Sequence, residues 1–170
     1  PDADASKIAA EKNGVSAFNS REAFHQAHPD MKLDAITLWH VLEHIPDLEN
    51  WFDFIDGHLK IDGTLFIAVP NCASYDARKF KENWAAYDVP RHLWRFTPKD
   101  IETLFRKHDY KLITTLPMAF DSFYVSMLSN KYKSGKSSLM SSFFTGLNSN
   151  LKANRTGREF SSQIYVLRKV

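Results

Sequence analysis

The sequence is poor in cysteine and glycine and has no long apolar run. It has one cysteine, Cys72, among 170 residues, which excludes an internal disulfide and fits a reducing compartment such as the cytoplasm. Its apolar runs are short, as at 65–70, so none can span a bilayer, and we expect no secretory leader at the start. Its six glycines form no G-x-G motif, so a glycine-rich turn between a strand and a helix is absent.

Acidic residues are scarce in the last part of the chain. From Asn130 onward there are eight Lys/Arg and one acid, Glu159, whereas the first 129 residues hold 14 Lys/Arg and 19 acids. A basic tail of this kind is typical either of a solvated helical face or of contact with an anionic partner. Few aromatic residues interleave with the basic ones, so nucleic acid is not predicted as a partner.

Helical and strand patterns alternate along the chain, which predicts an α/β domain with a mainly parallel sheet. Asp34–Trp39 and Thr64–Val69 show little alternation between apolar and polar residues, so we expect both to be covered on both faces of the sheet. Two helices near the end form a basic insertion at about 119–160. The expected strands are Val15–Phe18, Asp34–Trp39, Thr64–Val69, Lys111–Leu116 and Gln163–Arg168, and the expected helices cover about 4–12, 21–28, 48–59, 97–105, 122–132 and 138–153.

One short motif suggests metal chemistry. His40-Val41-Leu42-Glu43-His44 has the H-x-x-E-H spacing of a zinc hydrolase, in which two histidines hold the metal and the glutamate acts as a base. That chemistry needs one helix through all five residues, but here the motif directly follows an expected strand, and Pro46 interrupts it. We therefore predict no metal and keep a zinc hydrolase as a remote alternative.

Two linked segments resemble class I S-adenosylmethionine (AdoMet) dependent methyltransferases. Leu33–Asp47 resembles the fourth-strand motif FDxIxxxxVLEHxxD of that family, and Leu59–Asn71 resembles the LKxGGxLxIxxPN that follows it. Pro90–Pro98 is similar to the HLxxFTP stretch of a branch that includes bacterial enzymes acting on quinones, small metabolites or surface glycans. The resemblance implies a Rossmann-like fold, AdoMet as cofactor, and methyl transfer to a small-molecule or a glycan- or lipid-linked acceptor.

The resemblance also implies roles for individual residues. Leu38, Trp39 and His40 would lie beside the methionine end of AdoMet, and Asn19 stands where the family usually has an acid near the adenine. His92 is the expected catalytic base, because imidazole titrates near neutrality; alternatively, it braces its own loop. The residues expected to bind the acceptor are Asn71, Tyr75, Trp84, Tyr87 and Arg91.

Part of the family's sheet is missing from the pattern. The family's strand order is 3-2-1-4-5-7-6, and neither its glycine-rich first turn nor its ribose-binding acid is present here. We therefore expect 1–170 to be a single partial, N-terminally truncated domain that lacks the first two strands and by itself binds AdoMet weakly or not at all. An exposed edge of Asp34–Trp39 would then favour a homodimer. The alternative is a non-catalytic interaction module, in which 130–158 contacts an anionic partner or a membrane face.

Overall fold

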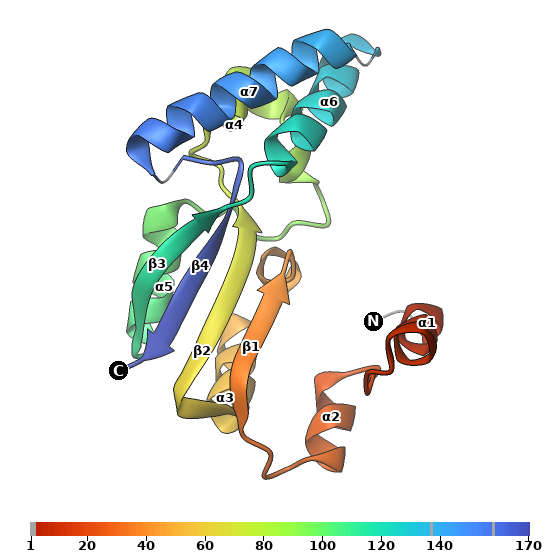
Figure 1. Ribbon diagram of the computed structural model, residues 1–170, viewed down its shortest axis with the longest axis vertical. Helices are drawn as coiled ribbons and strands as arrows, with labels where there is room; N and C mark the ends of the chain where they lie inside the picture. Colours follow the sequence, from red (N-terminus) through yellow and green to blue (C-terminus); the bar gives the residue numbers. More distant parts are fainter. Residues whose placement is uncertain (1–2, 137, 158) are drawn as a thin grey trace.

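The computed structural model describes residues 3–136, 138–157 and 159–170, and its centre is a four-stranded sheet (Figure 1). The strands are β1 (Leu33–Trp39), β2 (Leu59–Pro70), β3 (Tyr110–Pro117) and β4 (Ser162–Lys169), in the order β1-β2-β4-β3. β1 and β2 are parallel, whereas β4 is antiparallel to both of its neighbours. The α/β class is therefore confirmed, and the order agrees with the 4-5-7-6 part of the expected sheet. Three of these strands, β1, β2 and β3, run in the same direction, as a mainly parallel sheet requires, and β4 is the reversed one among the described strands.

Two helices cover one face of the sheet. α3 (Leu48–His58) and α5 (Pro98–Lys107) lie behind it in Figure 1. Each begins where a side chain satisfies free backbone amides: Asp47 accepts from the Asn50 amide at 3.2 Å, and Thr97 forms a capping box with Asp100. The apolar stripes of both helices pack against the strands, and the resulting core includes Phe52, Ile55, Leu65, Ile67, Ile101, Phe105 and Leu167.

A second group of helices stands over the carboxyl ends of β1 and β2 (Figure 1). α6 and α7 lie in the predicted insertion between β3 and β4, and they pack on α4 around Phe80 and Trp84. The bounds are Tyr75–Phe80 for α4, Asp121–Ser134 for α6 and Leu139–Thr156 for α7.

The fully buried carboxylate of Asp76 joins these helices. It accepts hydrogen bonds from Trp84 Nε1 at 2.8 Å, from Ser149 Oγ at 2.8 Å and from Ser161 Oγ at 2.7 Å. A buried carboxylate is tolerated when such donors replace water. These three bonds therefore tie α4 to α7 and to the segment that leads into β4.

The amino-terminal part departs from the predictions in two respects. α1 (Ala3–Asn13) and α2 (Arg21–Ala27) form as expected, but the predicted strand at Val15–Phe18 is wrong, because none of the four strands pairs with this segment. The expectation that β1 is covered on both faces is also wrong. Asp34, Ala35 and Thr37 are exposed, since the covering helices lie on the other face and β1 pairs with β2 alone among the described strands. No helix in the described ranges has both the length and the apolarity needed to cross a membrane.

Candidate functional site

A cavity of about 360 Å³ opens between the ends of β1 and β2 and helix α6. Its charged and imidazole side chains come from three separate segments: His40 after β1, Asp88 to His92 in the loop before α5, and Asp121 at the start of α6. Ligands of open α/β sheets bind beyond the carboxyl ends of the strands, so the cavity lies where a site is expected. The rest of the lining includes Pro70, Ala85, Ala86, Tyr124, Val125, Leu128, Tyr132 and Ser162.

His40 is held between two carboxylates. Its backbone φ of 51° lies in the left-handed region and turns the chain sharply after β1. Its Nδ1 lies 3.2 Å from Glu43 Oε1, and its Nε2 lies 3.2 Å from Asp121 Oδ2. The bond with Asp121, followed by that with Glu43, outweighs partial burial and raises the pKa of His40 to about 9. At neutral pH His40 is therefore an imidazolium that donates to both carboxylates.

The two carboxylates differ in their surroundings. Glu43 is only 1% exposed, and its Oε2 has no hydrogen-bond partner within the described chain, so the carboxylate relies on His40 for its compensating charge. Burial by itself would raise the pKa of Asp121, but hydrogen bonds from His40 and Ser162 outweigh burial and lower it. Two carboxylates around one imidazolium leave this part of the cavity with net negative charge.

His92 has one ring nitrogen fixed and the other directed at acidic groups. Its Nδ1 lies 2.8 Å from the Ala86 carbonyl oxygen, which can only accept, so Nδ1 carries the proton. Its Nε2 lies 3.9 Å from Glu43 Oε1 and 3.8 Å from Asp88 Oδ2. In the neutral ring Nε2 therefore has a lone pair at the cavity wall, and this nitrogen is the one that can accept a proton there.

Comparison with known proteins identifies the family. Residues 2–115 match the family model described as a methyltransferase domain, which is more than half of the chain. The chain belongs to the class I AdoMet-dependent methyltransferases. No curated protein matches its sequence.

Solved structures show the same fold at low sequence identity. A candidate sarcosine dimethylglycine methyltransferase from Galdieria sulphuraria has a TM-score of 0.53 and 13% identity, with 96% of this chain and 64% of that one covered. The YcgJ protein from Bacillus subtilis has a TM-score of 0.52 and 19% identity, with 98% and 77% covered. This chain therefore spans less than two thirds of the first structure and about three quarters of the second.

The cavity brings together only some of the predicted site residues. His40, Arg91 and His92 line it, although the exposed Arg91 is paired with Asp88 at 2.7 Å. Trp39 and Asn19 are exposed outside it, Trp39 on β1 and Asn19 in the segment before α2. Their contacts with the cofactor stay predictions.

The other predicted residues are engaged in packing. The amide of Asn71 is buried and donates to the Phe160 carbonyl at 3.1 Å, and the Trp84 ring is 2% exposed. Leu38 belongs to the core between the sheet and its helices. Tyr75 and Tyr87 are partly buried, with the cations of Lys152 and Arg95 over their respective rings. None of these five side chains lines the cavity, so the structure itself gives no contact between them and an acceptor.

The H-x-x-E-H motif does not form the arrangement of a zinc hydrolase. β1 ends at Trp39, and Leu42–His44 is a single 3-10 turn, so His40 and His44 do not share a helix. His40 is directed to Asp121, whereas His44 Nδ1 lies 3.0 Å from the Arg91 carbonyl oxygen. Possible ligand atoms of Glu43, His44 and His92 do lie within 4.8 Å of one another. This group contains His92 in place of His40, so it is not the ligand set of the motif.

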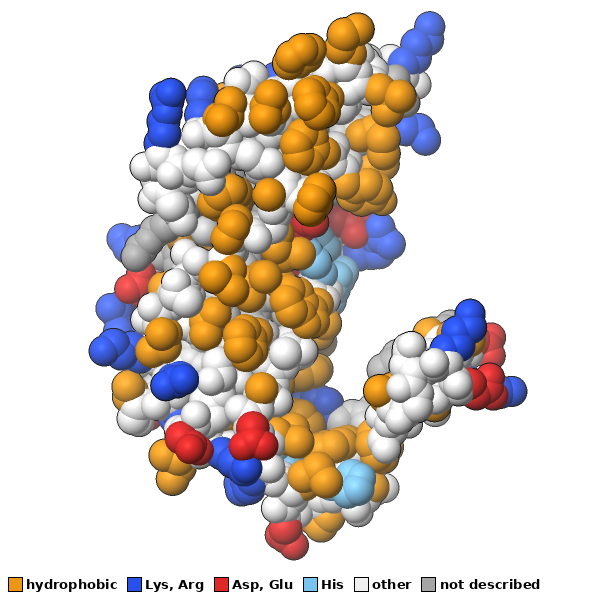
Figure 2. All heavy atoms as spheres, viewed as in Figure 1, with side chains coloured by type: hydrophobic (Ala, Val, Ile, Leu, Met, Phe, Trp, Pro, Cys, Tyr) orange, Lys and Arg blue, Asp and Glu red, His pale blue; other side chains and the backbone are white. Residues whose placement is uncertain are grey.

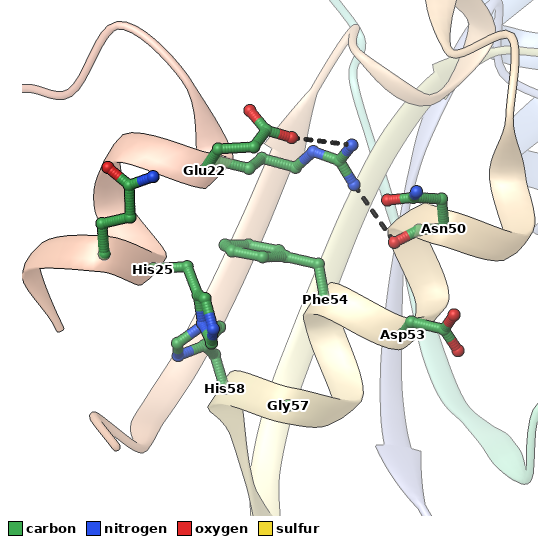
Figure 3. A pocket seen from close by; sticks show the side chains of 9 residues that line it. Glu22, His25, Asn50, Asp53, Phe54, Gly57 and His58 are labelled. Carbon is green, nitrogen blue, oxygen red and sulfur yellow. Dashed lines mark hydrogen bonds and ion pairs between the residues drawn. The ribbon is translucent and has the colours of Figure 1, made fainter. Parts of the chain in front are cut away.

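A second hollow, of about 480 Å³, lies between α2 and α3 (Figure 3). Its polar groups are used to attach one helix to the other. His25 Nδ1 lies 3.0 Å from His58 Nε2, and Arg21 donates to the Asn50 carbonyl at 3.1 Å. His58 Nδ1 in turn donates to the Met31 carbonyl at 2.9 Å, so the imidazoles form a chain that ends on the backbone. We interpret this hollow as a packing contact, because Arg21, His25 and His58 are used in bonds that hold the two helices together.

The α6 residues of the cavity were not predicted from the sequence. Asp121, Tyr124 and Tyr132 come from the insertion, more than 80 residues after His40. One signal was available: Asp121 is the single acid between Tyr110 and Arg158, at the start of an expected helix. An isolated acid in a basic region is a candidate for a specific ion pair.

Proposed function

We propose that this chain forms the acceptor side of a methyltransferase, and that it directs methyl transfer from AdoMet to a small-molecule or a glycan- or lipid-linked acceptor. The observation that carries the proposal is His92, whose Nε2 lies at the wall of a cavity beyond the parallel strands. A neutral imidazole there can remove a proton from an acceptor hydroxyl or amine.

Two features near the carboxyl end of β1 suit the cofactor. Trp39, 50% exposed at the end of β1, offers a flat apolar surface to a ligand lying beyond that strand. The His40, Glu43 and Asp121 cluster carries net negative charge, which favours the cationic sulfonium of AdoMet over a neutral thioether. AdoMet, when bound, supplies a methyl group on a sulfonium that is already activated. The residues of this chain then align the acceptor and hold the proton.

Cofactor contact is tested by titrating the isotope-labelled chain with millimolar S-adenosylhomocysteine. We expect amide shifts at 38–40 and at the indole of Trp39, whereas the indole of Trp51, in α3, stays unchanged. Because millimolar ligand reveals weak binding, absence of shifts at 38–40 would contradict the proposed cofactor position.

The role of His92 is tested by replacing it with asparagine. The side-chain NH₂ of asparagine takes the position of His92 Nδ1 and can still donate to the Ala86 carbonyl oxygen. Asparagine has no atom in the position of Nε2, so the proposed base is removed. We expect kcat for methyl transfer to fall by about 10²- to 10⁴-fold in H92N, with little change in Tm. An H92N enzyme with the kcat of the wild type would show that His92 only braces its loop.

A further inference from the structure

The α6–α7 hairpin has its large apolar side chains on the outside. In an ordinary surface helix the large apolar residues face the core. In α7 the buried stripe consists of small side chains, and Gly146 lies so close to α6 that an added Cβ would stand 2.7 Å from the Phe123 ring. α6 has the same character, since three of its four buried residues are serines. The buried set is Ser122, Val125, Ser126 and Ser129 in α6, and Ser142, Thr145, Gly146, Ser149 and Ala153 in α7.

The opposite face carries the large residues. Leu139, Met140, Phe143, Phe144, Leu147 and Leu151 are all exposed and lie along one side of α7. The exposed Phe120 and Tyr124 extend this face onto α6. A groove of about 600 Å³ between the two helices is lined almost wholly by apolar atoms. Figure 2 shows these side chains as a broad hydrophobic area over the hairpin. Contiguous apolar surface of this kind marks an interaction site.

The charges of the hairpin have one sign. From 122 to 157 the chain has Lys131, Lys133, Lys136, Lys152 and Arg155 and no acid. The first three lie at or near the end of α6, and the other two lie near the end of α7. Basic side chains therefore stand beyond both ends of the apolar face, as Figure 2 shows.

We propose that the α6–α7 hairpin is a docking surface for an anionic lipid membrane. The two helices contact one another through small residues and present large apolar residues outward. Helices in lipid pack in the same way. An apolar face flanked by Lys and Arg is typical of helices that lie at the surface of an anionic lipid bilayer. A surface with basic residues and no acid complements a layer of phosphate head groups better than it complements a second copy of itself, because two copies would bring like charges together.

The cavity opens beside this surface. Tyr124 lines both the cavity and the groove, and Tyr132, near the basic end of α6, also lines the cavity. A membrane bound to the hairpin would therefore lie next to the mouth of the site. The docking itself depends only on the hairpin and not on methyl transfer.

The proposal is tested by sedimentation with vesicles of phosphatidylcholine alone and with added phosphatidylglycerol. We expect the chain to bind the mixed vesicles and to lose binding as salt rises. We expect F143S/F144S to lower the partition coefficient at least 10-fold. We expect K131E/K133E to lower it more than 10-fold, because each basic residue near an anionic surface contributes roughly a fivefold factor.

A matched control replaces two exposed apolar residues elsewhere. Ile61 and Val170 are as exposed as the hairpin residues, and I61S/V170S should bind vesicles like the wild type. Circular dichroism and Tm check that each variant folds. Failure to bind anionic vesicles, equal binding to phosphatidylcholine alone, or self-association that F143S/F144S abolishes would each overturn the membrane proposal. The last outcome would identify the face as an interface between copies of the chain.

Discussion

The pairing of His40 with two carboxylates makes the stability of the fold depend on pH in a predictable direction. On folding, the pKa of His40 rises from its ordinary 6.5 to about 9. A group whose folded pKa is raised stabilises the native state fully below its unfolded pKa, and this contribution is lost as pH rises through the folded pKa. The free energy of unfolding should therefore fall between pH 6.5 and about 9.

The size of this effect is limited by exposure. A pKa rise of this size corresponds to at most about 3.4 kcal/mol, at about 1.4 kcal/mol for each tenfold change in proton affinity. The ring of His40 is 36% exposed, so water and salt screen part of the interaction. We expect a loss of about 1 to 2 kcal/mol across the pH window after this discount.

The change that isolates the effect is H40N. Asparagine tolerates the left-handed φ of 51°, so the turn after β1 is kept while the titrating ring is removed. Urea unfolding, followed by circular dichroism at pH 6 and pH 9.5, should show the loss in the wild type and a much smaller one in H40N. Comparison of the two chains removes the contribution of every other group that titrates in this range. Equal pH dependence in both would refute the assignment of His40 as a cation paired with Asp121 and Glu43.

Two further predictions concern packing. Asp76→Ala removes the acceptor of three buried donors, and it should lower the free energy of unfolding by about 3 kcal/mol or more in urea titrations; an unchanged midpoint would contradict the role given to this carboxylate. Gly146→Ala places a Cβ 2.7 Å from the Phe123 ring, and calorimetry should show the fold destabilised by about 1 to 2 kcal/mol. The control is Gly57→Ala in α3, where an added Cβ meets no atom within 4 Å; this change should leave stability unchanged or raise it. Equal Tm changes in the two glycine variants would argue against the close contact of α6 and α7.

Local signals in the sequence predicted most of the elements. Thr97-Pro98-Lys99-Asp100 predicted the start of α5, and the structure shows the capping box. The spacing of Leu48, Trp51, Phe52 and Ile55 predicted α3 in the same way. These predictions succeed because caps and helical stripes depend on residues within a few positions of one another. Val15–Phe18 fails for the opposite reason, since a strand exists only where a neighbour pairs with it.

The cavity could be predicted only in part. Its place beyond the strands follows from the fold class, which predicted His40, whereas His92 was predicted from the resemblance to the family. The partner of His40, Asp121, is brought there by a helical insertion whose direction no local pattern specifies. Trp84 shows what residue type alone leaves open: an aromatic residue in this loop suits an acceptor pocket or the core of the loop, and its indole is buried and bonded to Asp76.

The periodicity of α7 was predicted correctly, but it did not show which face is outside. Met140, Phe143, Phe144, Leu147 and Leu151 predict an amphipathic helix whether this stripe meets a core or a membrane. In the structure this stripe lies on the outside, because small residues on the opposite stripe allow α6 and α7 to approach closely.

The same hairpin supplies Asp121 to His40 from the first turn of α6. Any force on the outer face that displaces α6 therefore separates this ion pair, lowers the pKa of His40 toward its ordinary value, and weakens the charge compensation of buried Glu43. The outer face and the His40–Asp121 pair therefore share helix α6. A variant that loosens the hairpin should change the pH dependence set by His40 as well as the packing of α6 on α7.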